Sequence, residues 1–572
     1  MKSVTPRTLL PLILLIAGAL AASAAENKPP RNQAAKDEYK DASVHLGEDG
    51  KLVYTPDERG NLIPDFSRCG YMGGGVKIPD VPVKITLEPR DSMPKELAEF
   101  DPENPAAAGE GDDTERIQKA IDDVSAMPLD KNGFRGAVLL KRGVYRTTAA
   151  LRIGASGVVL RGEGQAKDGT VILCAPGENK RVAMVELYGE RIVKEVPGSR
   201  REIADTYVPW GVKSFNMKSV DGFAVGDNVV VFRPNTYAWL DVMGMRKYWG
   251  QKPREGQWMH FDFMNMRFER VITAIKGNRI TLDAPTVNAM EDKFGGGFVY
   301  KYTEQGAISQ SGLEHLRLIG AGPEPGYDIE YGFSFTGSVN CWARNITVLH
   351  TRCSISELGR KEHNYADTSL MGDCKFITVQ DCAALKHRGG GGRSSFYYRT
   401  VQFCLTQRCI SVGGRHCNGA AARVQGPNVF LDNPNEAMDV GPHHNYAMGF
   451  LFDNVKAWAM VAYHGRPHPH RGAQIVFWNV SGGRADIDQP PAARNYLFGM
   501  GRIKDGQWRG TVVEPRSLYL KQLEDRLGKE AVENVTTEAQ RKAVIDPKSE
   551  FFRDSYLWKP IKLGIDEGAG DR

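Results

Sequence analysis

Groups that can exchange protons near neutral pH concentrate in one stretch, residues 415–444. It holds Arg415, His416, Arg423, His443 and His444, and thus three of the chain's 12 histidines. Histidine is the side chain whose ordinary pKa lies closest to neutrality, and arginine presents a planar fork of donors that matches a carboxylate. The combination is typical of a site that moves a proton beside an anionic group. The alternative is that each histidine is a hydrogen-bonded structural residue, which is the more common use of a single histidine.

Short apolar runs recur between Ser311 and Ser481 and would position this stretch. Matching positions lie 22, 28, 21 and 26 residues apart, at Val379, Val401, Val429, Phe450 and Val476. This is the period expected of the coils of a parallel β-helix, in which stacked coils bury apolar faces that one coil could not bury alone. Residues one period apart would lie on neighbouring coils, about 4.7–4.9 Å apart. We therefore expect the loops around Arg393, His416 and His443 to line one side of a solenoid.

The start of the repetitive region carries a family resemblance. In GDDTERIQKAIDDVSAM, from Gly111, one face of a helix is formed by Ile117, Ala120, Ile121 and Val124, with Asp112, Asp113 and Thr114 as caps. GAVLLKRGVYR and GVVLRGEG follow. This order resembles the opening of the pectate-lyase-like, or rhamnogalacturonase- and epimerase-like, right-handed parallel β-helix proteins over residues 108–175. The resemblance implies that the helix caps the solenoid. It does not specify a reaction, because lyases, hydrolases, epimerases and tailspikes share this opening.

The predicted fold is therefore all-β, a right-handed parallel β-helix with an N-terminal capping helix, an inserted β-subdomain and a C-terminal helix. The expected parts are a signal peptide (1–25), a wrapping segment (26–107), the capping helix and first rungs (108–190), the inserted subdomain (191–300), the main β-helix with the site (301–505), and a C-terminal helical cap and tail (506–572). The insertion contains Trp239, Trp249 and Trp258, which could stack on sugars or fill its core. The C-terminal helix, with Leu518, Leu520, Leu523 and Leu527, is expected to seal the end of the solenoid.

The signal peptide prediction rests on Lys2 and Arg7 before an apolar core and on Ala22-Ser23-Ala24 after it. We expect a periplasmic or secreted protein, without a membrane span and monomeric. Seven of the nine cysteines fall between Cys341 and Cys417. These cysteines could form disulfides, which such a compartment permits, or they could be a stack of buried free thiols. A net charge of +5 without a basic tract argues against nucleic acid and allows an acidic polysaccharide partner.

The chemistry that this set of residues suits is β-elimination on a uronate-containing polysaccharide. A base must remove the proton at C5, and cations must stabilise the charge that develops on the neighbouring carboxylate. The prediction is a polysaccharide lyase with His416 or His443 as the base and Arg415 and Arg393 as carboxylate clamps. Substrate-binding roles are predicted for His444, Asn428, His387, Arg388, Arg423 and His464.

Two other functions stay open. A glycoside hydrolase would need paired carboxylates, for which the chain offers Asp367, Asp373, Asp381, Asp432 and Asp439, but it lacks the Asp-Asp and Gly-His-Gly of the polygalacturonase pattern. A non-catalytic glycan-binding β-helix is the third reading. No cofactor is predicted as required. Ca²⁺ could be held by Asp432 and Asp439, and His464, His468 and His470 are an alternative set of metal ligands.

Overall fold

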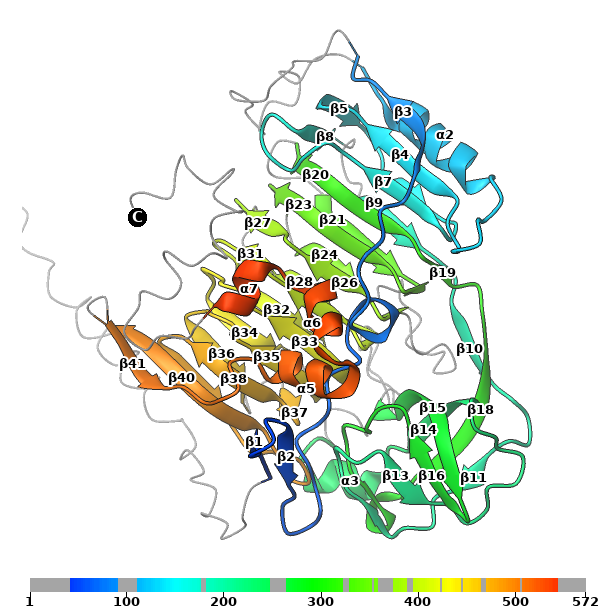
Figure 1. Ribbon diagram of the computed structural model, residues 1–572, viewed down its shortest axis with the longest axis vertical. Coiled ribbons are helices and arrows are strands. Elements are labelled where there is room, and N and C mark those ends of the chain that lie inside the picture. The colour runs from blue at the N-terminus through cyan, green and yellow to red at the C-terminus, as the bar shows by residue number, and fades with distance from the viewer. Residues whose placement is uncertain are drawn as a thin grey trace, which may run out of the picture. The chain divides into compact units, whose positions relative to one another are not determined.

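In the computed structural model, the described residues are 42–90, 111–175, 182–246, 264–321, 329–351, 354–358, 374–387, 394–421, 424–443, 446–463, 470–504 and 507–543 (Figure 1). The predicted signal peptide, the end of the C-terminal tail, Trp249 and Trp258 lie outside them. No helix in these ranges is long and apolar enough to cross a membrane.

Parallel strands from successive coils form two long sheets. Sheet 1 runs in the order β3 (Val83–Leu87), β4 (Gly136–Leu140), β7 (Val158–Arg161), β20 (Gly312–Gly320), β23 (Trp342–Leu349), β26 (Thr378–Gln380), β30 (Leu405–Gln407), β33 (Gln425–Leu431), β35 (Ala447–Asp453), β38 (Val476–Ser481) and β40 (Tyr496–Lys504). Sheet 2 runs in the order β6 (Leu151–Ile153), β9 (Val182–Tyr188), β21 (Ile329–Thr336), β24 (Ser354–Leu358), β28 (Ser395–Tyr398), β32 (His416–Ala420), β34 (Asp439–Pro442), β36 (Ala459–Ala462) and β39 (Arg484–Ile487).

Shorter parallel strands complete the coils. They are β5 (Gly143–Thr147), β8 (Thr170–Cys174), β27 (Ala383–Leu385), β31 (Ile410–Ser411) and β37 (Gly472–Ala473), and a small sheet of β19 (Ile308–Ser309), β22 (Ser338–Val339), β25 (Cys374–Lys375) and β29 (Val401–Gln402). The predicted parallel β-helix is confirmed.

The repeat itself differs from the predicted one. The observed ladder in sheet 1 joins Thr378, Leu405, Val429, Leu451, Val476 and Tyr496, which are 27, 24, 22, 25 and 20 residues apart. Val401 does not belong to it, because it pairs with Cys374 in the small sheet. Phe450 lies opposite Asn428 rather than Val429. The period was right, but the loops vary too much in length for sequence to set the register.

The interior of the coils is apolar and contains free thiols. Phe430, Phe452 and Phe477 stack on consecutive coils, with ring centroids 5.3 and 5.0 Å apart. All eight cysteines in the described ranges are buried and unbridged, so for these residues the thiol reading is confirmed.

The capping helix α2 spans Thr114–Ser125 and buries Ile117, Ala120, Ile121 and Val124, as predicted. Its capping agrees with the prediction in part. The carboxylate of Asp112, not Asp113, accepts a hydrogen bond from the Thr114 amide. The N-cap residue Asp113 instead receives hydrogen bonds from the guanidinium groups of Arg90 and Arg116.

The N-terminal segment is only partly a wrapping segment. Residues 42–78, including the hairpin of β1 (Ser43–Leu46) and β2 (Leu52–Thr55) and the short 3-10 helix η1 (Tyr71–Gly73), lie against sheet 1, where the Tyr71 amide donates to Thr378 Oγ1. Residues 83–87, however, form β3, the first strand of that sheet.

The C-terminal helices cover a side of the solenoid rather than its end, which corrects the prediction. In α5 (Leu518–Leu527), Leu518, Leu520 and Leu523 pack on outward residues of sheet 1 such as Val429 and Leu451. Leu527 is exposed. The last coil instead closes with an antiparallel pair, β40 and β41 (Gln507–Thr511).

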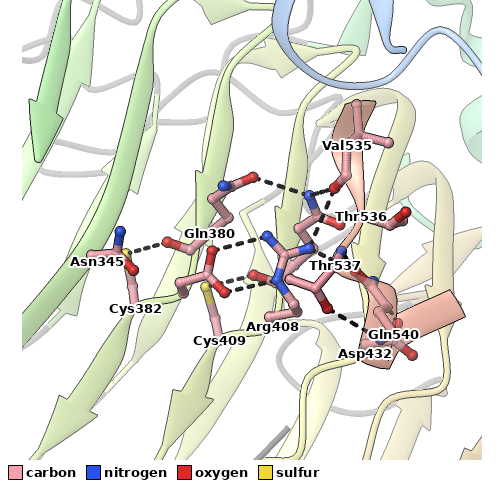
Figure 2. Close-up of polar contacts among 12 residues, drawn as sticks. Asn345, Gln380, Cys382, Arg408, Cys409, Asp432, Val535, Thr536, Thr537 and Gln540 are labelled. Carbon is pink, nitrogen blue, oxygen red and sulfur yellow. Dashed lines mark hydrogen bonds and ion pairs between the residues drawn. The ribbon is translucent and has the colours of Figure 1, made fainter. Parts of the chain in front are cut away.

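Polar contacts secure the following helices, α6 (Lys529–Val535) and α7 (Glu538–Lys542), to the same side. Figure 2 shows Gln540 between two coils, where it accepts from Arg408 Nη1 at 2.7 Å and donates to Asp432 Oδ2 at 2.6 Å. The carbonyl of Val535 accepts from Arg408 as well.

The predicted insertion is an antiparallel sheet of β10 (Ile192–Glu195), β11 (Arg201–Glu202), β13 (Ser214–Asn216), β14 (Asn228–Arg233), β15 (Met266–Lys276), β16 (Arg279–Leu282) and β18 (Phe298–Gln305), with β12 (Tyr207–Val208) paired to β17 (Met290–Glu291), and with α3 (Tyr237–Val242) and the 3-10 helix η4 (Asp292–Phe294). Trp239 is completely buried and its ring meets Tyr446 edge-on at 5.0 Å, so it is a core residue. The insertion thereby packs on the corner that follows β34.

Candidate active site

Four side chains from three consecutive coils meet on the outer face of sheet 2. Tyr397 belongs to β28, His416 to β32 and Asp439 to β34, and His443 directly follows β34. The register places His416 opposite Asp439 and Tyr397 opposite Gly419. Neighbouring residues Cys417 and Val440 point into the core, as the alternation of a strand requires.

The absence of a side chain at Gly419 makes room for this cluster. A Cβ atom there would lie only 2.8 and 2.9 Å from Cδ2 and Cε2 of Tyr397. The tyrosine ring therefore lies across β32 and reaches the next coil. Its hydroxyl is 3.4 Å from Nδ1 of His443, and the two rings meet edge-on with centroids 6.5 Å apart.

One ring nitrogen of His416 has a hydrogen-bond partner among the described residues, and the other has none. Its Nδ1 is 2.8 Å from Oδ1 of Asp439, and because a carboxylate only accepts, this contact places a proton on Nδ1. Its Nε2 is buried, and no group in the described ranges forms a hydrogen bond with it. The ring stacks on His443 with centroids 4.0 Å apart and an interplanar angle of 24°. A neutral His416 thus offers a lone pair on Nε2.

Tyr397 lies between groups of opposite charge. Burial raises the pKa of its hydroxyl well above the ordinary range, the Arg471 guanidinium acts to lower it, and the Asp439 carboxylate raises it. The hydroxyl is consequently protonated at neutral pH and can donate. The Arg399 guanidinium carbon lies 5.6 Å from the centre of the same ring.

Arg471 supplies a positive charge near the tyrosine. Its guanidinium carbon lies 4.4 Å from the ring centre of Tyr463, and its Nε is buried without a hydrogen-bond partner. No acidic side chain in the described ranges forms an ion pair with it. Together the cluster provides a proton acceptor, a proton donor and a cation suited to a carboxylate.

The structure brings together only part of the predicted set. His416 and His443 lie in contact. Arg415 is exposed directly before β32 and has no ion pair within the described chain. His387 bonds through Nε2 to the hydroxyl groups of Ser395 and Ser411.

The structure contradicts the predicted substrate-binding role of Asn428. This residue lies on β33 of sheet 1, not on sheet 2, and its Oδ1 accepts from the backbone amide of Cys404, so it supports a turn between coils and is not part of the cluster. The remaining predicted residues lie outside the described ranges: Arg393, Arg388, Arg423, His444 and His464.

Tyr397 and Arg471 were missed by the sequence prediction. Tyr397 lies 19 residues before His416, close to one coil, and this spacing could have drawn attention to it. Nothing in the local sequence distinguishes Arg471 from other arginines.

The aspartates proposed for hydrolysis do not form a pair among the described residues. Asp432 is held by Arg516 and Gln540, Asp381 by Arg408, and Asp439 by His416. Asp367 and Asp373 lie outside the described ranges. Asp432 and Asp439 have different partners and do not share a calcium site. No group of three or more metal-ligating side chains occurs in the part of the chain described.

No family model and no curated protein matches the chain. Among solved structures, it is similar to the tailspike protein gp49 of Pseudomonas phage LKA1 (10% identity, 74% of this chain and 80% of the other, TM-score 0.29). It is also similar to the A-module of the mannuronan C-5 epimerase AlgE6 of Azotobacter vinelandii (13%, 65% and 70%, 0.27) and to the endo-xylogalacturonan hydrolase of Aspergillus tubingensis (10%, 72% and 95%, 0.24). These scores assign no activity to the chain.

Proposed function

We propose that the protein is a carbohydrate-active enzyme that cleaves a uronate-containing polysaccharide by β-elimination. The observation that carries the proposal is His416, whose Nδ1 is tied to Asp439 while its buried Nε2 has no hydrogen-bond partner in the described chain. A buried polar atom is normally satisfied, and a substrate C–H aimed at this nitrogen would give it a function.

In the proposed reaction, Nε2 of His416 takes the proton from C5 of the uronate. The electron pair released from C5 forms the C4–C5 double bond, and the bond from C4 to the glycosidic oxygen breaks. The Tyr397 hydroxyl gives a proton to the leaving oxygen. His443, 3.4 Å away through Nδ1, is placed to return a proton to the tyrosine from solvent.

Arg471 is the candidate for binding the uronate carboxylate. Negative charge accumulates there as C5 loses its proton, and a fixed guanidinium stabilises that charge more in the transition state than in the ground state. In this proposal Arg471 takes the role that the sequence assigned to Arg415 and Arg393.

The test is to incubate the purified protein with pectate, alginate, ulvan, glucuronan and glycosaminoglycans while following the ultraviolet absorbance of the unsaturated product. A rise with one polymer, abolished in His416→Ala, supports the lyase. New reducing ends without that absorbance would indicate hydrolysis, and binding without either signal would indicate a glycan-binding protein. Each of these last two results overturns the proposal.

A further inference from the structure

Next to the candidate active site, exposed side chains form a row across four coils. Backbone hydrogen bonds connect its members in order: the Met438 amide donates to Gly414 O beside Arg415, the Ala459 amide to Met438 O, and the Gly483 and Arg484 amides to Trp458 O. In the register of the strands, His416, Asp439, Ala459 and Arg484 lie opposite one another, so Arg415, Met438, Trp458 and Gly483 each stand one position earlier. Arg415, Met438 and Trp458 therefore form a row beside His416 and Asp439, and Arg484, next to Gly483, closes the end of this row at Trp458.

Two large apolar side chains in the middle of this row face solvent. Trp458 is 57% exposed and Met438 is 52% exposed, and they occupy equivalent positions on adjacent coils. Such exposure is unusual for tryptophan, which is mostly buried, and adjacent exposed apolar groups commonly mark a binding surface.

The backbone of Trp458 is held by hydrogen bonds, and its indole lies against the following coil. Its backbone amide donates to Ala437 O at 3.0 Å, and its carbonyl accepts from Gly483 at 2.9 Å. A Cβ atom at Gly483 would lie 3.4 Å from Nε1 of the indole, so the ring lies close to that glycine. The Arg484 guanidinium carbon is 5.5 Å from the ring centre. A ring supported in this way loses less conformational freedom than an unsupported one when a ligand stacks on it.

Cations stand at both ends of the apolar pair. Arg415 is exposed and forms no ion pair with the described residues, whereas Arg484 is held by Asp486, with Nε 2.5 Å from Oδ2. Three strand spacings of about 4.8 Å make the row roughly 14 Å long, more than one sugar ring. An acidic oligosaccharide matches this surface, because sugar rings present apolar C–H faces to an indole and carboxylates to arginine.

We infer that Trp458, with Met438 and the flanking Arg415 and Arg484, forms a binding subsite for an acidic sugar residue of a polymer that runs across the coils toward His416. This inference deepens the proposed function and rests on it for the direction of the chain. The binding itself does not depend on the reaction.

The test measures the affinity of the full chain by electrophoresis in gels that contain polygalacturonate, alginate or glucuronan, with neutral dextran as the comparison polymer. Trp458→Ala is expected to weaken binding to the acidic polymer about tenfold, whereas Trp458→Phe keeps most of it. Arg484→Gln is expected to weaken binding as well.

Tyr237→Ala is the matched control. Tyr237 is 48% exposed, and the Arg246 guanidinium carbon lies 4.6 Å from its ring centre, but Tyr237 lies on α3 of the insertion and Arg246 follows that helix. Its removal is expected to leave binding unchanged.

The outcomes separate this inference from the lyase proposal. Weaker binding by Trp458→Ala without elimination by the parent protein would support the subsite and refute the lyase. Elimination together with unchanged binding by Trp458→Ala would refute the subsite alone. Equal affinity for dextran, or no binding of any acidic polymer by the parent protein, would also overturn the subsite.

Discussion

The imidazole rings of His416 and His443 stack with centroids 4.0 Å apart, although the two residues start and follow strands of different coils. Gly419 carries no side chain on the outer face, and this leaves room for the Tyr397 ring, whose hydroxyl reaches His443. In this pair, His416 is hydrogen-bonded to Asp439, and His443 is hydrogen-bonded to Tyr397.

Asp439→Asn tests how His416 is held. An amide can present its NH₂ to Nδ1 of the imidazole, and this would move the proton to Nε2, where a base needs a lone pair. We expect kcat/KM on the substrate polymer to fall about 10²- to 10⁴-fold, with an unchanged melting temperature. A variant with the activity of the parent protein would show that the tautomer of His416 is not used.

Gly419→Ala tests the space above β32. The added methyl group would lie 2.8 Å from the Tyr397 ring and displace it from His443. We expect a loss of activity of at least about tenfold, since small displacements of reacting groups are costly. Gly154→Ala is the control, because a Cβ atom there meets nothing within 4 Å. Equal activity of the two variants would contradict the placement of Tyr397.

Arg471 is predicted to act on charge in the transition state. Arg471→Met is expected to lower kcat by about 10²-fold, and Arg471→Lys by less, since the ammonium keeps the charge but loses the planar fork. Steady-state kinetics separate a change in kcat from a change in KM. A change in KM alone would mean that the residue only binds the ground state.

Asp453 is predicted to make stability depend on pH. Its carboxylate is fully buried beneath α5, and this burial is the main reason why its pKa is raised to about 7. The Asp432 carboxylate raises the pKa further. Hydrogen bonds from the Tyr519 amide and the Ser517 hydroxyl, and the charge of Arg516, act to lower it. The pKa in the unfolded chain is about 3.9. The folded state therefore binds more protons between these values, and its stability falls as pH rises from about 4 through about 7, by at most about 1.4 kcal/mol per pH unit.

Asp453→Asn should remove this contribution. Melting temperatures of the parent protein and the variant, recorded across that pH window, are expected to converge or cross as pH rises, because only the parent protein has to ionise a buried acid. Parallel curves at all pH values would show that Asp453 does not titrate there.

Much of the architecture could be predicted from the chain alone. The face of α2 formed by Ile117 and Val124 and the recurrence of short apolar runs are local patterns, set by the helical period and by the need to bury each coil. The concentration of histidine around residue 416 likewise identified the region of the site.

Tertiary structure alone decided which residues meet there. The loops between coils differ in length, and a shift of one residue moves a side chain from the outer face to the core. Asn428 is thus buried, and Asp432 forms an ion pair with Arg516 beneath the C-terminal helices. Tyr397 lies over Gly419. The register between coils places His416, Asp439 and His443 together, and local sequence patterns do not determine that register.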